Sequence, residues 1–150
     1  MKKSQRLNVI VDLYVRQERE ALEAMGTSQQ RLADQQNQLD QLVQYRLEYL
    51  QRFEARQRAG INVGQLLEFR AFADKLDGAI EGQRRQVLQC ERDLQKARGL
   101  WEQCHQRTKS LKRVKELAAV DEAKTEQKRE QAEQDDRAAR SRRDDGTGRA

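Results

Sequence analysis

The sequence predicts an all-α protein, a long antiparallel two-helix coiled-coil hairpin with a frayed or disordered C-terminal tail. Three observations carry this prediction. Of the 150 residues, 37% are charged, 5% are aromatic and none is proline, which leaves too little apolar material for a thick globular core. Apolar residues recur in a seven-residue pattern that is typical of helices wrapping around one another. A glycine-rich interruption near residue 62 divides this pattern into two blocks.

The first block predicts a helix from the N-terminal region to the interruption. Alternating steps of four and three residues from Leu7 to Phe53 reach fourteen positions, of which ten are apolar. This is the spacing of a buried stripe on one side of a helix. The series consists of Leu7, Val11, Tyr14, Glu18, Ala21, Met25, Ser28, Leu32, Gln35, Leu39, Leu42, Arg46, Tyr49 and Phe53.

The interruption, Gly60 to Gly64, predicts a turn at about residues 60–64, because glycine tolerates positive φ and asparagine often does too. A chain reversal there would place Trp101 opposite Ala21, a large side chain against a small one. The alternative is one long helix in a parallel dimer. That arrangement would keep two glycines inside a helix at a cost of about 1 kcal/mol each, so the hairpin is favoured.

The second block predicts the returning helix. The same stepping from Phe69 to Ala118 meets polar residues at Gln83, Thr108 and Lys115, and the apolar stripe ends after Ala118. Beyond it, charges of both signs alternate with alanine and glutamine. We therefore expect a hairpin over residues 1–118 and, over 119–150, a charged helical extension that passes into a disordered tail.

Residues that could support catalysis are sparse, and we expect neither an enzyme nor a cofactor or metal site. The single histidine, His105, lies beside Cys104 without further ligands at suitable spacing. Cys90 and Cys104 both fall on the stripe, where they are expected to be small core residues in a reducing compartment. There is no transmembrane run, and Asn8 and Asp12 interrupt the apolar residues of the N-terminus, so a signal peptide is not expected.

Basic residues gather at both ends of the predicted hairpin, which a chain reversal would bring to one place. Such a cluster favours an acidic surface, either a protein ring or nucleic acid. Nucleic acid is disfavoured because no aromatic side chains are interleaved as stacking platforms. The plain alternative is that these charges solvate a coiled coil. This basic tip consists of Lys2, Lys3, Arg6, Arg107, Lys109, Lys112, Arg113 and Lys115.

Aromatic and apolar residues also lie beside the stripe in the half of the hairpin near the turn. Tyr45, Phe72 and Ala79 are not needed for pairing of the helices, yet the predicted register brings them to one side. An exposed patch of this kind usually has a partner. This apolar face consists of Gln38, Leu42, Tyr45, Tyr49, Phe72, Leu76, Ala79 and Gln83.

The length, the heptad hairpin, the segments LVQYRLEYL, GIN and FADKLDGAI, and the region of Trp101 resemble the FliJ family of the bacterial flagellar type III export apparatus. The resemblance covers roughly residues 5–118. It implies an antiparallel coiled coil similar to the central stalk of rotary ATPases. The implied location is cytoplasmic, peripheral at the cytoplasmic face of the inner membrane at the flagellar base, with no transmembrane segment.

The same resemblance implies three partners. The basic tip corresponds in location to the part that enters the hexameric ring of the export ATPase. The apolar face corresponds to the family's binding face for the cytosolic segment of the export gate, with Gln83 standing where some relatives have histidine. Empty export chaperones are the third partner. A generic structural coiled-coil scaffold is the alternative function, and it would require only the stripe.

Overall fold

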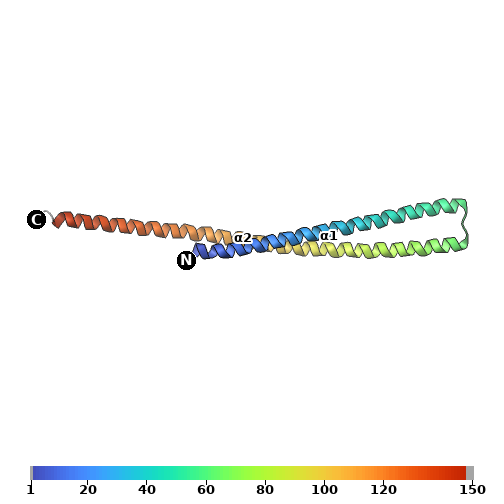
Figure 1. Ribbon diagram of the computed structural model, residues 1–150, viewed down its shortest axis with the longest axis horizontal. Helices are drawn as coiled ribbons and strands as arrows, with labels where there is room; N and C mark the ends of the chain where they lie inside the picture. The colour runs from blue at the N-terminus through green and yellow to red at the C-terminus, as the bar shows by residue number, and fades with distance from the viewer. Residues whose placement is uncertain (1, 148–150) are drawn as a thin grey trace. The chain divides into compact units, whose positions relative to one another are not determined.

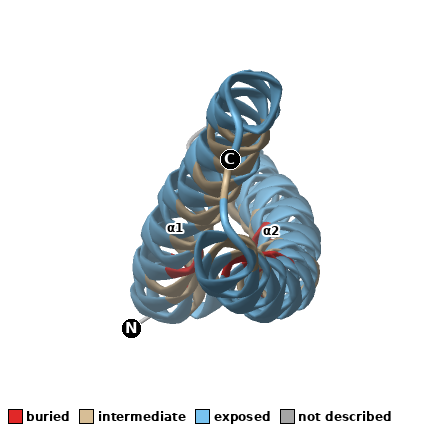
Figure 2. Ribbon diagram, turned by 90° about the vertical axis from the view of Figure 1, so that its right-hand side faces the viewer, coloured by how far each residue is buried: buried red, intermediate tan, exposed pale blue. Residues whose placement is uncertain are grey.

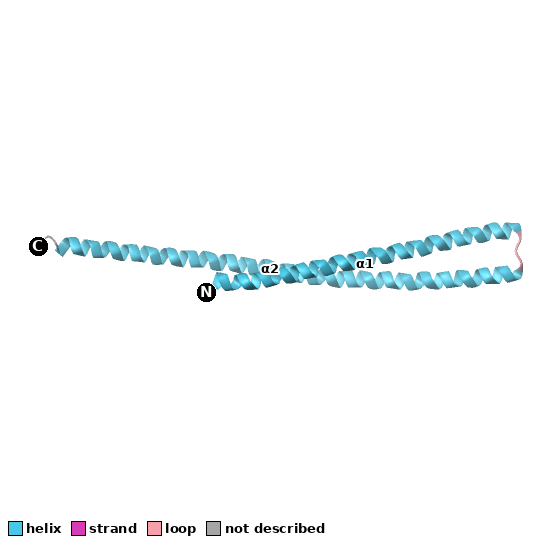
Figure 3. Cartoon of the chain, viewed as in Figure 1, coloured by secondary structure: helices cyan, strands magenta, loops and turns pink. Residues whose placement is uncertain are grey.

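The computed structural model describes residues 2–147, which form two helices joined by a short turn (Figure 1). Helix α1 spans Lys3–Ala59 and helix α2 spans Val63–Thr147. Within the described range there is no strand (Figure 3). The all-α class predicted from the sequence is confirmed.

Contacts divide the chain into two units, which are described separately. The terminal unit comprises the described parts of Met1–Gln17 and Cys104–Ala150, and the turn unit comprises Glu18–Gln103. In each unit a stretch of α1 lies against a stretch of α2.

The predicted stripe forms the contact between the helices in both units. Every position of the two series, from Leu7 to Phe53 and from Phe69 to Ala118, is buried or half-buried. Figure 2 shows how little of the ribbon is buried, as expected when two helices share one narrow seam. The buried residues are Ala21, Leu76, Ile80, Val87 and Cys90 in the turn unit, and Val11, Cys104, Thr108 and Ala118 in the terminal unit.

Side-chain contacts across the seam fix the antiparallel register. In the turn unit, Arg46 Nε lies 2.5 Å from Asp77 Oδ1, and Gln83 Nε2 donates to Gln35. Contacts in the terminal unit follow the same register and are described with the basic tip below. The antiparallel pairing predicted from the sequence is therefore confirmed.

The turn is narrower than the predicted residues 60–64. Gly60 ends α1 with a φ of 94°, a left-handed conformation that glycine adopts without steric cost. Asn62 does not adopt a positive φ; it directly precedes α2 and caps its first turn. Its Oδ1 accepts from the Gln65 N–H at 2.8 Å, while its own N–H donates to Gln65 Oε1 at 3.2 Å. This reciprocal pair is a capping box that satisfies two backbone donors at the start of α2.

Helix α2 continues through the charged region that follows Ala118. Residues 127–146 are all exposed, and ion pairs one turn apart support the helix. Examples are Arg129 with Glu126 at 2.7 Å and Arg140 with Asp136 at 3.1 Å. The charged extension is thus helical to Thr147, while the last residues of the predicted tail, 148–150, lie outside the described residues. The domain boundary at residue 118 stays a prediction.

Candidate functional site

Five aromatic side chains of the turn unit form one continuous cluster across the helix pair. The Phe69 ring stacks on Phe53 at 3.6 Å and on Tyr49 at 4.5 Å between ring centroids. Phe72 lies 4.7 Å from Tyr49 and meets Tyr45 edge-on at 6.3 Å. Such pairs contribute roughly 0.5–1.5 kcal/mol each beyond the area they bury. Stacking of Phe69 on Tyr49 and Phe53 therefore contributes to the seam near the turn.

The outer members of this aromatic cluster stay accessible to solvent. Tyr45 is 41% exposed and Phe72 is 36% exposed, whereas Tyr49, Phe53 and Phe69 are half-buried. Tyr45 and Phe72 come from different helices and touch each other. The structure thus brings these two side chains of the predicted apolar face together.

The other members of the apolar face divide between its surface and its support. Gln38 and Ala79 are exposed and Leu42 is half-buried. Leu76 is only 7% exposed, so it belongs to the core beneath the face rather than to its surface. The Gln83 amide also points inward, donating to the Gln35 backbone oxygen at 3.0 Å and to its Oε1 at 2.7 Å. Both residues lie on the heptad series, which could have indicated their inward orientation.

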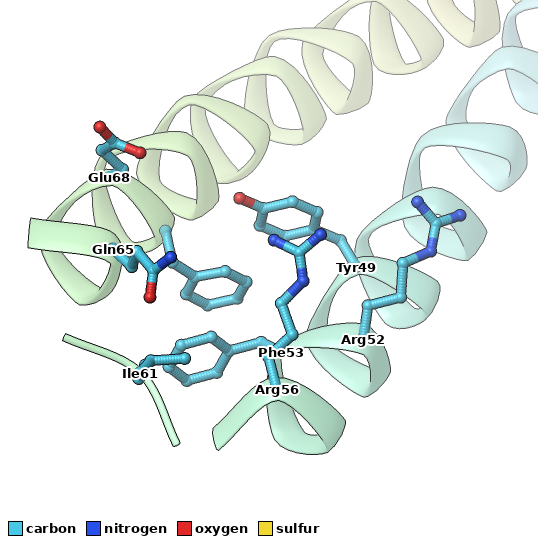
Figure 4. A pocket seen from close by; sticks show the side chains of 8 residues that line it. Tyr49, Arg52, Phe53, Arg56, Ile61, Gln65 and Glu68 are labelled. Atoms are coloured by element: carbon cyan, nitrogen blue, oxygen red, sulfur yellow. The ribbon is translucent and has the colours of Figure 1, made fainter. Parts of the chain in front are cut away.

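A hollow of about 260 Å³ adjoins the aromatic cluster where the chain turns (Figure 4). In this view the Phe53 ring points towards Ile61 of the turn, while the Glu68 side chain points away from the rings. Arg52 and Arg56 of α1 contribute cations to its lining. The sequence alone does not indicate this hollow, because its existence depends on how far the two helices diverge beside the turn.

The cations of the basic tip fall into two groups within the terminal unit. Lys2, Lys3 and Arg6 line a hollow that also contains Asp121, Glu122 and Glu126. These carboxylates oppose the N-terminal cations, so the positive charge there is smaller than the sequence indicated. The second group lies on α2, where a shallow hollow is lined by Lys109, Lys112 and Arg113 together with Glu116.

Two cations of the basic tip contact the other helix and so contribute to the pairing of α1 with α2. Lys115 occupies a seam position and its ammonium group donates to Asn8 Oδ1. Arg107 lies over the Tyr14 ring, 4.1 Å from its centroid, and donates to Gln17 Oε1. Since Lys115 falls on the heptad series, its structural use could have been read from the sequence. The cation–π contact of Arg107 could not, because it depends on the side-chain geometry.

The first turn of α1 is capped by a carboxylate from α2. Ser4 Oγ donates to Glu122 Oε2 at 2.6 Å, and the Ser4 N–H donates to Oε1 at 3.0 Å. The hydroxyl and then the backbone N–H of Ser4 lower the pKa of Glu122, and the charge of Lys2 acts in the same direction. A negative charge is favourable here because the first N–H groups of a helix have no partner inside it.

This cap predicts fraying of α1 at acidic pH. The pKa of Glu122 is lower in the folded than in the unfolded chain. The contact therefore stabilises the fold fully at pH values above the pKa that Glu122 has in the unfolded chain. That stabilisation is lost as the pH falls through the pKa that Glu122 has in the folded chain. We expect faster amide exchange at Ser4 and Gln5 in that range, measured by NMR. Glu122→Gln should cause the fraying at neutral pH, whereas the exposed control Glu130→Gln should not; equal protection in both variants would contradict the cap.

Both cysteines of the chain lie inside the helix pair. Cys90 and Cys104 are buried free thiols on the seam, as expected for small core residues. Among residues 2–147, no group of His, Cys, Asp or Glu is placed to hold a metal ion. Neither helix, over that same range, is both long and apolar enough to cross a membrane.

The fold and its surface define a class: a two-helix coiled-coil protein with exposed apolar and charged side chains along a narrow buried seam. A family model described as Flagellar FliJ protein matches residues 2–146, and the chain belongs to the FliJ family. It is thereby a component of the flagellar export apparatus. Comparison with curated proteins and with solved structures finds no match.

Proposed function

We propose that this chain is a non-enzymatic, central-stalk-like component that couples the export ATPase ring to the export gate and escorts export chaperones. Family membership supports the setting in the flagellar export apparatus. The observation that carries the proposal is the exposed aromatic pair of Tyr45 and Phe72, which the pairing of the helices does not require. In the cell the protein would lie at the cytoplasmic face of the inner membrane, where the gate is.

The apolar face is proposed as the contact for the cytosolic segment of the gate. Tyr45 and Phe72 present ring surface to solvent, and the Tyr49 ring, which stacks on Phe69, contacts both of them. Rigid aromatic side chains with part of their surface exposed are common anchors of protein interfaces, because they bury much area at little cost in conformational entropy. Gln38, Leu42 and Ala79 extend this contact, and Leu76 and Gln83 support it from the seam.

The basic tip is proposed as the contact for the ATPase ring. Lys109, Lys112 and Arg113 lie together on α2, and their long side chains are exposed. A concentration of cations on a helix surface accelerates association with an acidic partner and is sensitive to salt. Arg107 and Lys115 are assigned to holding the helices together instead, because their charged groups engage α1.

The alternative of a generic scaffold makes different demands on the sequence. A scaffold needs the seam and is indifferent to exposed side chains such as Tyr45 or Lys112. The coupling proposal requires that exposed side chains on each surface affect binding without changing the fold. Substitution of exposed residues therefore separates the two functions.

The first such test is charge reversal at the tip. The variant Lys109→Glu, Lys112→Glu and Arg113→Glu should retain its helicity, since exposed ion pairs such as Arg113 with Glu116 at 3.6 Å contribute at most about 1 kcal/mol. Its affinity for the export ATPase at low salt should fall by roughly tenfold or more, because the steering charge is inverted. Stimulation of ATP hydrolysis measured over a range of protein concentrations would report this loss.

A matched control places the same charge change in the turn unit. Lys75, Arg85 and Arg92 are exposed cations of α2, and their reversal to glutamate should leave stimulation of the ATPase unchanged. Raising the salt concentration should weaken binding of the unmodified protein and reduce the difference between it and the tip variant. Equal stimulation by both variants would remove the basic tip from the mechanism.

A further inference from the structure

The hollow beside the turn, which we call the turn hollow, has an apolar floor (Figure 4). The Phe69 ring stacks on Phe53 and on Tyr49, and the Phe53 ring points towards Ile61. All four side chains are half-buried and line the hollow, so part of their apolar surface remains accessible within it. Such a floor attracts a bulky apolar group, because contact with it removes apolar surface from water.

The size of the turn hollow limits what it can hold. Its volume of about 260 Å³ is smaller than the roughly 300–1,000 Å³ that is usual for sites of small molecules and cofactors. A single bulky side chain with the groups next to it therefore fits better than a cofactor does. A concave site also suits an inserted side chain better than a flat lipid surface.

Two arginines beside this floor have no carboxylate partner. Arg52 and Arg56 line the turn hollow from α1, one helical turn apart, and both are exposed. Neither forms an ion pair with a carboxylate of residues 2–147. Like charges one turn apart on a helix repel each other, so this arrangement does not help α1 to form. A bound anion would offset the repulsion.

The lining from α2 is compatible with an anion as well. Glu68 brings a carboxylate to the lining, but its side chain points away from the rings (Figure 4). Gln65 uses its Oε1 to accept from the Asn62 N–H in the capping box, which leaves its amide nitrogen as a donor. The turn hollow thus combines an apolar floor with cations and a neutral donor.

We propose that the turn hollow binds an acidic peptide segment of a partner protein, with one bulky apolar side chain on the floor and the flanking carboxylates on Arg52 and Arg56. Arginine binds a carboxylate through two parallel hydrogen bonds, which fixes the orientation of the segment. The apolar side chain supplies short-range affinity, and the charges select an acidic sequence around it. This contact is additional to the proposed contacts with the gate and the ATPase and does not rest on them.

The first test uses three synthetic heptapeptides with blocked ends, titrated into the full chain by isothermal titration calorimetry. One has phenylalanine at its centre and aspartates on both sides. The second has alanine in place of the phenylalanine, and the third has asparagines in place of the aspartates. The first peptide should bind saturably, and the other two at least about tenfold more weakly. No saturable binding of the first peptide, or equal binding of either control peptide, would refute the site.

The second test removes the two cations. Arg52→Gln with Arg56→Gln should keep its helicity in circular dichroism, because both positions are exposed and glutamine is a good helix former. Its affinity for the first peptide should fall by about tenfold or more at low salt, and by less at high salt. Arg85→Gln with Arg92→Gln removes the same charge from exposed positions outside the lining and should bind normally. Equal affinity in the two variants would overturn the proposal.

The third test addresses the apolar floor through a residue outside both helices. Ile61→Ser should leave the helices intact, yet lower the affinity for the first peptide severalfold, because part of the floor is lost. The control is Val63→Ser, since Val63 is 73% exposed and does not line the turn hollow. If the two serine variants bind the peptide equally well, the floor does not take part and the site is wrong.

Two further outcomes would assign the turn hollow to another occupant and overturn the proposal. Tyr45→Ala with Phe72→Ala should still bind the first peptide, and loss of that binding would make the hollow part of the apolar face. Co-sedimentation of the unmodified protein with phosphatidylglycerol vesicles, lost in Arg52→Gln with Arg56→Gln, would make the occupant a membrane surface. The proposed function stands in either case, because its own tests use the gate segment and the ATPase.

Discussion

Replacing Tyr45 and Phe72 by alanine together is expected to abolish capture of the export gate's cytosolic segment while leaving the helical content of the protein unchanged. Truncating an aromatic anchor commonly costs about 2 kcal/mol of binding free energy or more, roughly thirtyfold in affinity, and here two anchors are removed. Both rings also contact Tyr49, so a small decrease in thermal stability is expected from the lost aromatic pairs. Isothermal titration calorimetry with the gate segment measures the affinity, and motility of the parent bacterium should decline with it.

The control for this variant uses exposed apolar residues of the same stretch of α1. Val43 is 44% exposed and Leu47 is 49% exposed, and they line a hollow with Arg46 and Asp77 rather than the aromatic cluster. Val43→Ala with Leu47→Ala should bind the gate segment normally. If the aromatic variant binds as well as this control, the apolar face is not the gate contact and the scaffold function becomes the better explanation.

The largest loss of stability is expected from Phe69→Ala. Phe69 stacks on two rings at once, Phe53 and Tyr49, and its removal leaves a void between the helices beside the turn. Truncation of a well-packed phenylalanine lowers the free energy of unfolding by about 3 kcal/mol or more. Because Phe69 is only half-buried, we expect a loss close to about 3 kcal/mol rather than a larger one. Urea denaturation followed by circular dichroism measures the change.

Leu67→Ala provides the comparison, because Leu67 is close in sequence and 60% exposed. Its removal should change the free energy of unfolding by about 0.5 kcal/mol or less. Similar denaturation midpoints for the Phe69 and Leu67 variants would mean that the aromatic stack does not hold the turn unit together.

Much of the fold could be predicted because a coiled coil repeats one simple contact. The heptad spacing identified the seam from Leu7 to Ala118, since each side chain at such a position faces the other helix whatever its neighbours are. Gly60 marked the reversal because a helix that ends in the left-handed region favours glycine. The capping box of Asn62 and Gln65 was also readable, as an asparagine followed three residues later by glutamine.

The candidate surfaces were less predictable, because a heptad pattern gives the side of a helix but not the reach of a side chain. Tyr45 and Phe72 could be assigned to one side, whereas the stacking of Phe69 on Tyr49 depends on the register to within one layer. Lys3 and Asp121, which carry opposite charges, line the same hollow. Their proximity likewise depends on where α1 begins relative to α2. Helix α2 continues to Thr147, and ion pairs one turn apart, such as Arg129 with Glu126 and Arg140 with Asp136, support this last part of the helix. The amino-acid composition of residues 119–150 does not reveal such pairs, because they depend on the spacing of the charges.

The proposed coupling requires that one molecule bind the gate and the ATPase at the same time. The most direct measurement immobilises the gate's cytosolic segment on a biosensor, loads this protein, and then adds the ATPase hexamer. The proposal predicts a further increase in bound mass, which Lys109→Glu, Lys112→Glu and Arg113→Glu should prevent without affecting the loading step. Release of the protein from the gate segment on addition of the ATPase would show that the two partners compete for one surface, and would contradict the coupling function.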